Sequence, residues 1–272
     1  MKINKILTLI IVMSLCTGSV ISAETAYKTA CPFVRVTTNM LGYNFIARKI
    51  AQSVLKKSLS KTMKGDLSVK FDSFSGVDMK KGKFRGLTIS GENLCVEDEV
   101  YITKMFIETT SDFNYVDYTK EPIEFKTDVP MDYTVEISES DLNKTMTTGS
   151  TFDVISSLLP LVSIEKPKLK LEKEKIRINS GIKFPFGKTI KFSMSAGMKV
   201  ENGKVVLTNV NSTTSNNDFA EKLVELINKN NVLENMKIGL VEGADTIVKV
   251  KEVKIDSKKI LVNGSIVIKK AE

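Results

Sequence analysis

Apolar and polar residues alternate along several stretches of this chain, and no other feature of the sequence constrains the fold as strongly. Successive side chains of a β-strand point to opposite faces, so a strand that is buried on one face produces this alternation. The sequence therefore predicts long strands with one apolar face and one polar face. The longest run consists of Ile190, Phe192, Met194, Ala196, Met198 and Val200.

Other stretches with the same pattern fill most of the chain between its helical segments. We expect residues 83–90 to form one strand and residues 100–107 to form a pair of strands. Asn202-Gly203 is typical of a two-residue hairpin turn. The short connections between the predicted strands favour antiparallel pairing. The remaining predicted strands lie at residues 67–71, 131–137, 169–178, 205–207 and 247–268.

Three segments instead show the three- and four-residue spacing of an amphipathic helix. We expect the first helix at residues 43–64, ended by Gly65, and the second at residues 138–160. The second begins with Ser138 and Asp141, which resemble a capping box. A third helix is expected to begin at Asp218. Strands outnumber helices, so the predicted fold class is α+β, with a long antiparallel sheet packed on a few amphipathic helices.

The first predicted helix carries basic residues opposite its apolar stripe, and it contains no acidic residue. Two interpretations stay open. The basic face is either the solvated outer face of an ordinary core helix or a cationic strip that meets anionic headgroups. The basic residues are Arg48, Lys49, Lys56, Lys57, Lys61 and Lys64.

The first 23 residues show the order of features that is typical of a secretory signal peptide. Lys2 and Lys5 precede an apolar stretch over residues 6–16, and residues 21–23 (ISA) fit a cleavage site before Glu24. An uncleaved anchor is the alternative, because the uncharged stretch is just long enough to span a bilayer. In either case we predict export to the periplasm or cell envelope.

The composition excludes several classes of chemistry. The chain has no histidine, which excludes Ser-His and Cys-His nucleophilic catalysis and His-ligated metals. The formal net charge of +8, or +6 once Lys2 and Lys5 leave with the signal peptide, suits anionic surfaces such as phospholipid headgroups. We expect no nucleic-acid partner, because the basic residues are not interleaved with aromatic ones.

Neither the acidic clusters nor the cysteines form a recognisable set of catalytic residues. The acidic residues at 97–99 and 136–141 are explained by a turn and by a helix N-terminus. We predict no catalytic residue, no cofactor and no metal. Cys31 and Cys95 remain after export, and in an oxidising compartment they either form a disulfide or stay as two free thiols.

Several segments match a known family in their order along the chain. Residues 82–90 (GKFRGLTIS), Asn93-Leu94 and residues 100–107 (VYITKMFI) follow one another in the first half. Residues 135–143 (VEISESDLN) form the predicted strand-to-helix step, and residues 198–207 (MKVENGKVVL) form the predicted hairpin. This pattern resembles the LmeA-like phospholipid-binding family.

The resemblance implies a curved sheet wrapped around helices, similar to tubular lipid-binding domains. The resemblance covers roughly Phe45 to Ile268. Together with the signal pattern it divides the chain into a signal peptide at residues 1–23, a linker at residues 24–42 and a lipid-binding domain at residues 43–272. It also implies phospholipid binding without catalysis. The basic charge of the chain favours an anionic phospholipid and a membrane surface as partners. Two alternatives stay open, a structural envelope protein without a lipid cavity and a cell-wall carbohydrate-active enzyme.

Residue spacing indicates where a lipid would bind. We expect acyl chains to lie between the first helix and the sheet, with the headgroup at a rim near Arg48, Lys49 or Lys56. The predicted lipid-binding residues are Ile50, Val54, Leu55, Leu59, Phe71, Phe84, Leu87, Ile89, Met105, Tyr133 and Val135.

Overall fold

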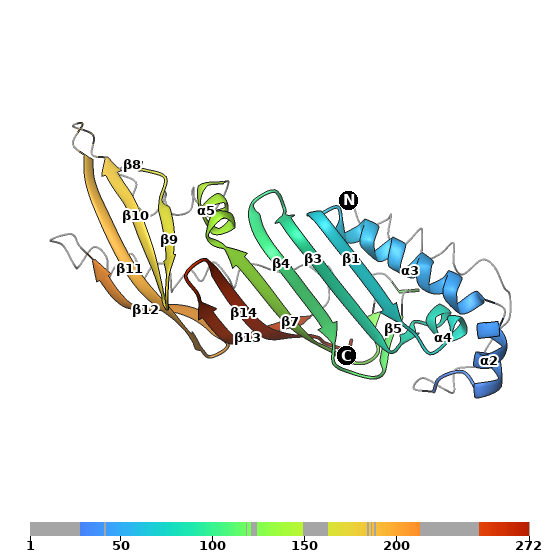
Figure 1. Cartoon of the computed structure of the whole chain (residues 1–272). Coiled ribbons are helices and arrows are strands. Elements are labelled where there is room, and N and C mark those ends of the chain that lie inside the picture. Colours follow the sequence, from blue (N-terminus) through green and yellow to red (C-terminus); the bar gives the residue numbers. More distant parts are fainter. Residues whose placement is uncertain are drawn as a thin grey trace.

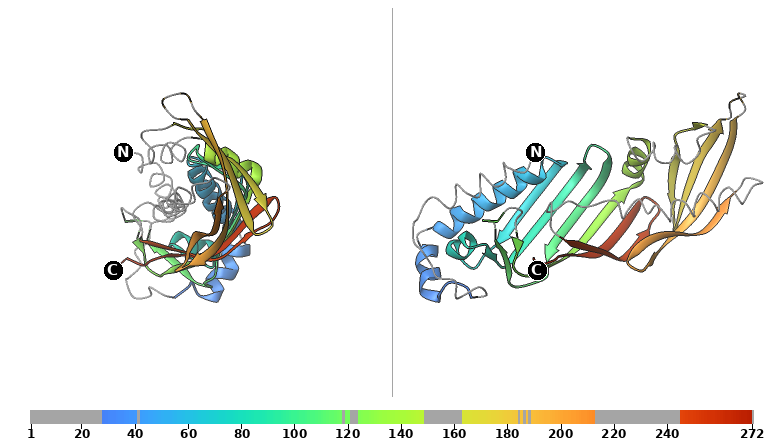
Figure 2. Two further views of the ribbon diagram at one scale, coloured as in Figure 1. Left: turned by 90° about the vertical axis from the view of Figure 1, so that its left-hand side faces the viewer. Right: turned by 180° about the vertical axis from the view of Figure 1, so that it is seen from behind.

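The protein is elongated, with helices gathered toward one end and long strands over the rest of its length (Figure 1). The structure is a computed structural model. Viewed along the long axis, the main sheet is curved (Figure 2). The described residues are 28–40, 42–117, 119–120, 124–148, 163–183, 185, 187, 189–212 and 245–271.

The described strands form three sheets, and every pairing within them is antiparallel, as predicted. The main sheet has the order β1 (Met63–Asp72), β3 (Gly86–Val96), β4 (Val100–Thr109), β7 (Val129–Ser138), β14 (Lys259–Ile268), β13 (Thr246–Ile255). The second sheet has the order β12 (Lys204–Ser212), β11 (Thr189–Glu201), β10 (Lys175–Lys183), β8 (Ser163–Ile164), and β9 (Lys168–Glu172) also pairs with β10. The third comprises β2 (Lys83–Phe84), β5 (Asn114–Asp117) and β6 (Glu124–Phe125).

Four helices accompany the sheets within the described residues. They are α2 (Pro32–Met40), α3 (Tyr43–Leu59), α4 (Gly76–Lys80) and α5 (Glu139–Thr147). None of these helices is both long and apolar enough to cross a membrane. The predicted fold class is confirmed, because the protein combines a large curved antiparallel sheet with a few helices.

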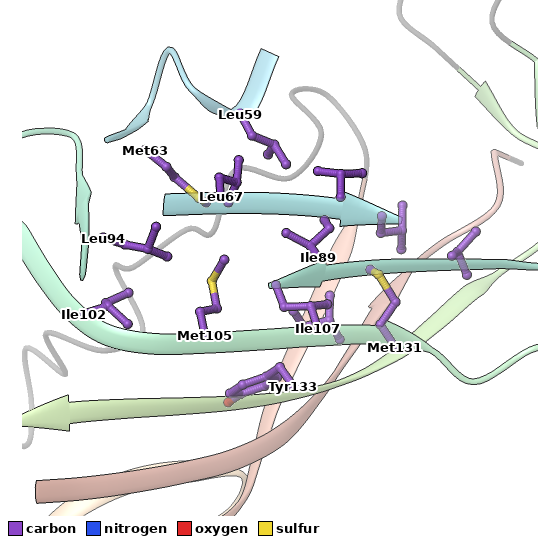
Figure 3. Packing of buried hydrophobic residues seen from close by; sticks show 14 of the residues in the cluster. Leu59, Met63, Leu67, Ile89, Leu94, Ile102, Met105, Ile107, Met131 and Tyr133 are labelled. Atoms are coloured by element: carbon purple, nitrogen blue, oxygen red, sulfur yellow. The ribbon is translucent and has the colours of Figure 1, made fainter. Parts of the chain in front are cut away.

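The strand register places apolar residues in rows across one face of the main sheet. Val69 pairs with Ile89, Ile89 with Ile107, Ile107 with Tyr133, and Tyr133 with Gly264. Because paired residues share a face, this row continues across five strands. The main hydrophobic core lies on this face, where α3, β1, β3, β4 and β7 all contribute side chains (Figure 3).

The neighbouring row lies on the opposite face and is mostly polar. Ser68, Ser90, Phe106, Thr134 and Asn263 follow one another through the same pairings. Phe106 is the exception to this polarity and is 44% exposed. The predicted separation into an apolar and a polar face is therefore present, and we refer to the two as the apolar face and the polar face of the main sheet.

The first predicted helix ends earlier than its spacing indicates. Helix α3 stops at Leu59 rather than at residue 64, and Met63 already pairs with Val96 in the sheet. A longer helix would remove Met63 from this pairing, where its side chain is 5% exposed. Gly65 does not end the helix but lies at a bulge in β1, with a φ of 126°.

Other boundaries also differ from the predictions. Residues 83–90 are divided between β2 and β3, because Lys83 and Phe84 pair with β5 in the third sheet. Residues 100–107 belong to the single strand β4 rather than to a pair of strands. The predicted linker contains helix α2. The helical segments expected at residues 149–160 and from Asp218 onwards lie outside the described residues.

Helix α5 joins the main sheet to the second sheet. Leu142 and Met146 pack against a second apolar cluster that contains Leu169, Leu171 and Ile260. At its polar positions the helix binds the backbone of β9: the Asn143 amide donates to the Leu169 carbonyl, and the Leu171 N–H donates to the Glu139 carboxylate, both over 2.8 Å. The helix therefore fixes the position of β9 relative to the main sheet.

The start of α5 confirms the predicted cap. Ser138 Oγ accepts a hydrogen bond from the Asp141 N–H over 3.1 Å, and it donates to the Asp141 carboxylate over 2.8 Å. Thr103 on β4 donates to the same carboxylate over 2.7 Å. Burial alone would raise the pKa of Asp141, but the hydrogen bonds from Thr103, Ser138 and Lys144 outweigh it and lower the pKa.

We expect Asp141→Asn to reduce the free energy of unfolding at pH 7 by about 1–2 kcal/mol, since a charged acceptor of several hydrogen bonds is lost. The wild-type carboxylate stabilises the fold above its unfolded pKa and loses this effect as the pH falls through its lower folded pKa. The difference should therefore shrink at pH values below about 4. Urea unfolding at both pH values measures it.

Asp98→Asn is the control for this measurement. Asp98 pairs with Lys64, but both side chains are 67% exposed, so its loss should change the stability by less than about 1 kcal/mol. Equal effects of the two substitutions at pH 7 would contradict the role given to Asp141.

Candidate functional site

The predicted lipid-binding residues fall into two groups in the structure. Five are packed in the interior: Leu59, Phe84, Ile89, Met105 and Tyr133, each with an exposed fraction of 6% or less. The other six retain exposed surface: Leu55, Leu87 and Val135 are half-buried against the core, Val54 and Phe71 are half-buried, and Ile50 is 41% exposed. Ile89, Met105 and Tyr133 form the floor of the apolar face, whereas Leu59 lies on α3 and Phe84 on β2. The second group provides the accessible surface.

Tyr133 lies at the centre of this floor. Its ring is packed over Gly264 so closely that a Cβ at Gly264 would lie 2.5 Å from ring atoms and 2.3 Å from the Lys249 carbonyl oxygen. Only glycine leaves room for the ring at this position. Burial raises the pKa of the Tyr133 hydroxyl.

Phe71 and Phe84 close the apolar face at the end of β1. Their ring centroids lie 5.0 Å apart, with planes tilted by 55°. This is a favourable geometry for two aromatic rings. The contact ties β1 to the third sheet, so Phe84 is positioned by a strand separate from the one that carries Leu87.

The three predicted rim residues lie on α3 in different environments. Arg48 is half-buried, and its Nε donates to the Asn44 carbonyl over 3.4 Å. Lys49 is exposed, with its ammonium 5.6 Å from the centroid of the Phe45 ring. Lys56 is exposed further along the helix. Of the three, Arg48 is the one that lines a cleft.

This cleft has a volume of about 280 Å³ and lies between α2, α3 and the segment that follows β1. We call it the arginine cleft, because it is lined by two guanidinium groups. Arg35 Nη2 and Ser73 Oγ are buried there and have no hydrogen-bond partner within the described residues. The lining residues are Arg35, Val36, Asn39, Asn44, Arg48, Ser73 and Phe74.

A buried carboxylate beneath the cleft positions Arg35. Asp78 is 1% exposed, and its Oδ2 lies 3.5 Å from Arg35 Nε. Asp78 also accepts hydrogen bonds from Ser75 Oγ over 2.6 Å and from the Ala30 N–H. The Arg35 guanidinium packs 5.1 Å from the centroid of the Phe74 ring. These contacts hold one edge of the guanidinium and orient its remaining donors.

A second buried cation lies near this carboxylate. Lys83 is 4% exposed, and its ammonium donates to the Lys28 carbonyl over 2.6 Å. Burial lowers the pKa of Lys83, and repulsion from Lys81 adds to this effect. The environment of the cleft therefore holds more positive than negative charge.

Sequence reasoning missed Arg35 and Ser73. Arg35 lies in the segment interpreted as a linker, although Pro32 is suited to the first position of a helix. The spacing of Phe33, Val36 and Met40 would also have indicated a helix, α2. Nothing in the sequence places Ser73 beside α2, because that proximity depends on the turn after β1.

The two cysteines are free thiols, the second of the two alternatives that the sequence left open. Cys95 pairs with Lys64 at the beginning of β1, whereas Cys31 precedes α2, which lies beyond the other end of that strand (Figure 1). The ten residues of β1 separate the two ends by roughly 30 Å. A disulfide bridges only Cα atoms that lie within about 7 Å.

The acidic clusters have structural roles. Glu97 and Asp98 occupy the exposed turn between β3 and β4 with positive φ values. Glu136 forms an ion pair with Lys259 over 2.9 Å. Asp141 caps α5, as described above. Within the described residues, no group of three or more Cys, Asp or Glu residues could hold a metal ion.

The fold and this site define a class of protein: an elongated α+β protein with a curved antiparallel sheet, an apolar face partly covered by a helix, and a basic cleft beside it. Comparison with known protein families identifies the family to which the chain belongs. Residues 42–265 match the LmeA-like phospholipid-binding family, so the chain belongs to that family. No curated protein and no solved structure matches the chain.

The two groups of predicted residues should respond differently to truncation. Met105→Ala should lower the free energy of unfolding by about 2–5 kcal/mol, because it leaves a cavity in the floor. Ile50→Ala removes an exposed side chain and should change stability by about 0.5 kcal/mol or less. Urea unfolding of both variants tests the division, and a large loss for Ile50→Ala would refute it.

Proposed function

We propose that this protein is exported to the cell envelope and binds phospholipid acyl chains on the apolar face of the main sheet, beneath α3, without catalysing a reaction. Membership of a phospholipid-binding family is the observation that carries this proposal. The apolar row from Val69 to Gly264 supports the location, because it runs across five strands. The signal-like N-terminus supports export.

The accessible residues are the best candidates for contact with an acyl chain. Leu55 packs against the core from α3, Val54 is half-buried on the same helix, and Leu87 and Val135 lie half-buried on the sheet itself. Each methylene group removed from water contributes about 0.8 kcal/mol, so burial of part of an acyl chain suffices for stable binding. The basic side chains of α3, including Arg48, are suited to hold the headgroup of an anionic phospholipid at the rim.

The rival functions have less support. A carbohydrate-active enzyme needs two carboxyl groups that face each other across a cleft. The acidic clusters of the sequence instead have structural roles: they lie in a turn, form an ion pair with Lys259 or cap a helix. A structural envelope protein would leave the exposed parts of the apolar face without a ligand, and lipid analysis separates the two functions.

Native mass spectrometry of protein purified without detergent should detect phospholipid in near-stoichiometric amounts. Val54→Gln should reduce the bound fraction about fivefold, because a polar side chain then faces the acyl chain. The matched control is Ser53→Gln, which introduces the same side chain at an exposed position on the same helix. The absence of bound lipid after incubation with anionic vesicles would overturn the proposal.

Export has its own test. If the signal peptide is cleaved, the mature protein begins at Glu24 and lacks residues 1–23. N-terminal sequencing of protein from the envelope fraction should read Glu-Thr-Ala. An intact N-terminus in a membrane fraction would indicate the anchor, whereas intact protein in the cytosol would refute export.

A further inference from the structure

We propose that α2 and the N-terminal half of α3 form a surface that docks on an anionic phospholipid bilayer, with the phosphate group of one lipid in the arginine cleft. We call this surface the docking tip, and it comprises Pro32–Met40 and residues 42–50. The inference rests on the proposed function and extends it, because it names the site that binds the lipid headgroup.

The docking tip exposes several large apolar side chains to solvent. Phe33 is 75% exposed and Met40 is 83% exposed, while Phe45 and Ile46 are 60% and 55% exposed. Elsewhere in the described chain, exposed large apolar residues are confined to Phe106, Ile247 and Val248. Exposed apolar side chains concentrated in two neighbouring helices indicate an interaction surface.

The helical spacing directs these side chains outward together. Phe33, Val36 and Met40 recur at three and four residues on α2, so they share a face. Phe45 and Ile46 lie side by side at the start of α3. Gly42, with a φ of 70°, forms the turn between the two helices. The tip is therefore a helical corner with an apolar outer surface.

The charge of the tip selects the partner. No acidic residue occurs between Thr25 and Gly65. Helix α3 carries Arg48, Lys49, Lys56 and Lys57, and none of them forms an ion pair within the described residues. Apolar side chains flanked only by cations suit the interface of an anionic bilayer.

The arginine cleft supplies a site for the phosphate. Arg35 and Arg48 both line it, and Asp78 is bound to only one edge of Arg35. Arg35 Nη2 and Ser73 Oγ are donors that lack an acceptor among the described residues. The planar guanidinium fork matches the oxygens of a phosphate. A phosphate in the cleft would offer acceptor oxygens, which these buried donors would reach through a small side-chain movement.

The position of the cleft connects the bilayer to the apolar face. Arg48 lies seven residues before Leu55 on α3, which corresponds to about 10 Å along the helix. Leu55 packs against the main core. A lipid with its phosphate at Arg48 therefore has the apolar face within reach of its acyl chains.

The chain contains no tryptophan, so a single introduced tryptophan reports one position. We expect Phe45→Trp to show a blue-shifted emission with phosphatidylglycerol vesicles, and strong quenching when their acyl chains are brominated. Phe106→Trp is the matched control, because Phe106 is also exposed but lies on the polar face. An unchanged emission of Phe45→Trp, or equal quenching of both variants, would overturn the docking tip.

A second arm tests the phosphate site. Arg48→Gln should weaken binding to phosphatidylglycerol vesicles about fivefold or more, whereas Arg177→Gln should not, because Arg177 lies on β10 and pairs with Glu172. Vesicles with the same negative charge from fatty acid should bind more weakly and be insensitive to Arg48→Gln. Equal binding to both vesicle types would overturn phosphate recognition. So would binding of inorganic phosphate with no vesicle binding, which would indicate a free-anion site.

The double variant Phe33→Ser/Phe45→Ser separates this inference from the proposed function. Neither residue belongs to the predicted lipid-binding set, so lipid retained in solution should match wild type while vesicle binding falls at least about tenfold. Unchanged vesicle binding would refute the docking tip alone. A different outcome would refute the acyl site and leave the docking tip supported. In that outcome the wild-type protein contains no lipid, but the Phe45→Trp variant still inserts into vesicles.

Discussion

The antiparallel register of the main sheet is the constraint on which the rest of the structure depends. Because side chains alternate along each strand, a shift of one residue in any pairing would move apolar residues to the polar face. The aligned row from Val69 through Ile107 to Gly264 shows that this does not happen across five strands. The residues of the floor, Ile89, Met105 and Tyr133, therefore also belong to the core of the fold.

This coincidence limits what the floor can do. Met105 and Ile107 are so fully enclosed that they cannot exchange partners without a loss of stability. Under the proposed function, lipid would instead contact the boundary of the core, where α3 and the strand ends leave Val54, Phe71 and Leu87 half-buried. Helix α5 and the Asp141 cap act elsewhere, where they fix the second sheet against the main one.

Local patterns in the sequence predicted the strands, the turn at Asn202-Gly203 and the cap at Ser138, because each depends on neighbouring residues alone. These patterns gave wrong boundaries where a residue distant in the sequence determines the structure. Met63 continues the helical spacing of Leu59, yet its pairing with Val96 draws it into the sheet. Likewise Arg48 was recognised as a rim residue, but the cleft needs Ser73 and Arg35 from other segments, and only the folded chain brings the three together.

Helix α3 is apolar both where it packs against the core and where it is exposed to solvent, which is not needed in an ordinary core helix. Its C-terminal half packs Leu55 and Leu59 against the core, while its N-terminal half exposes Phe45 and Ile46. The apolar residues thus extend beyond the part of the helix that the sheet covers, and they do so where acidic residues are absent. In water such a surface is unfavourable. Under the proposed docking, an anionic bilayer would remove this penalty, and α3 would lead from the membrane to the apolar face.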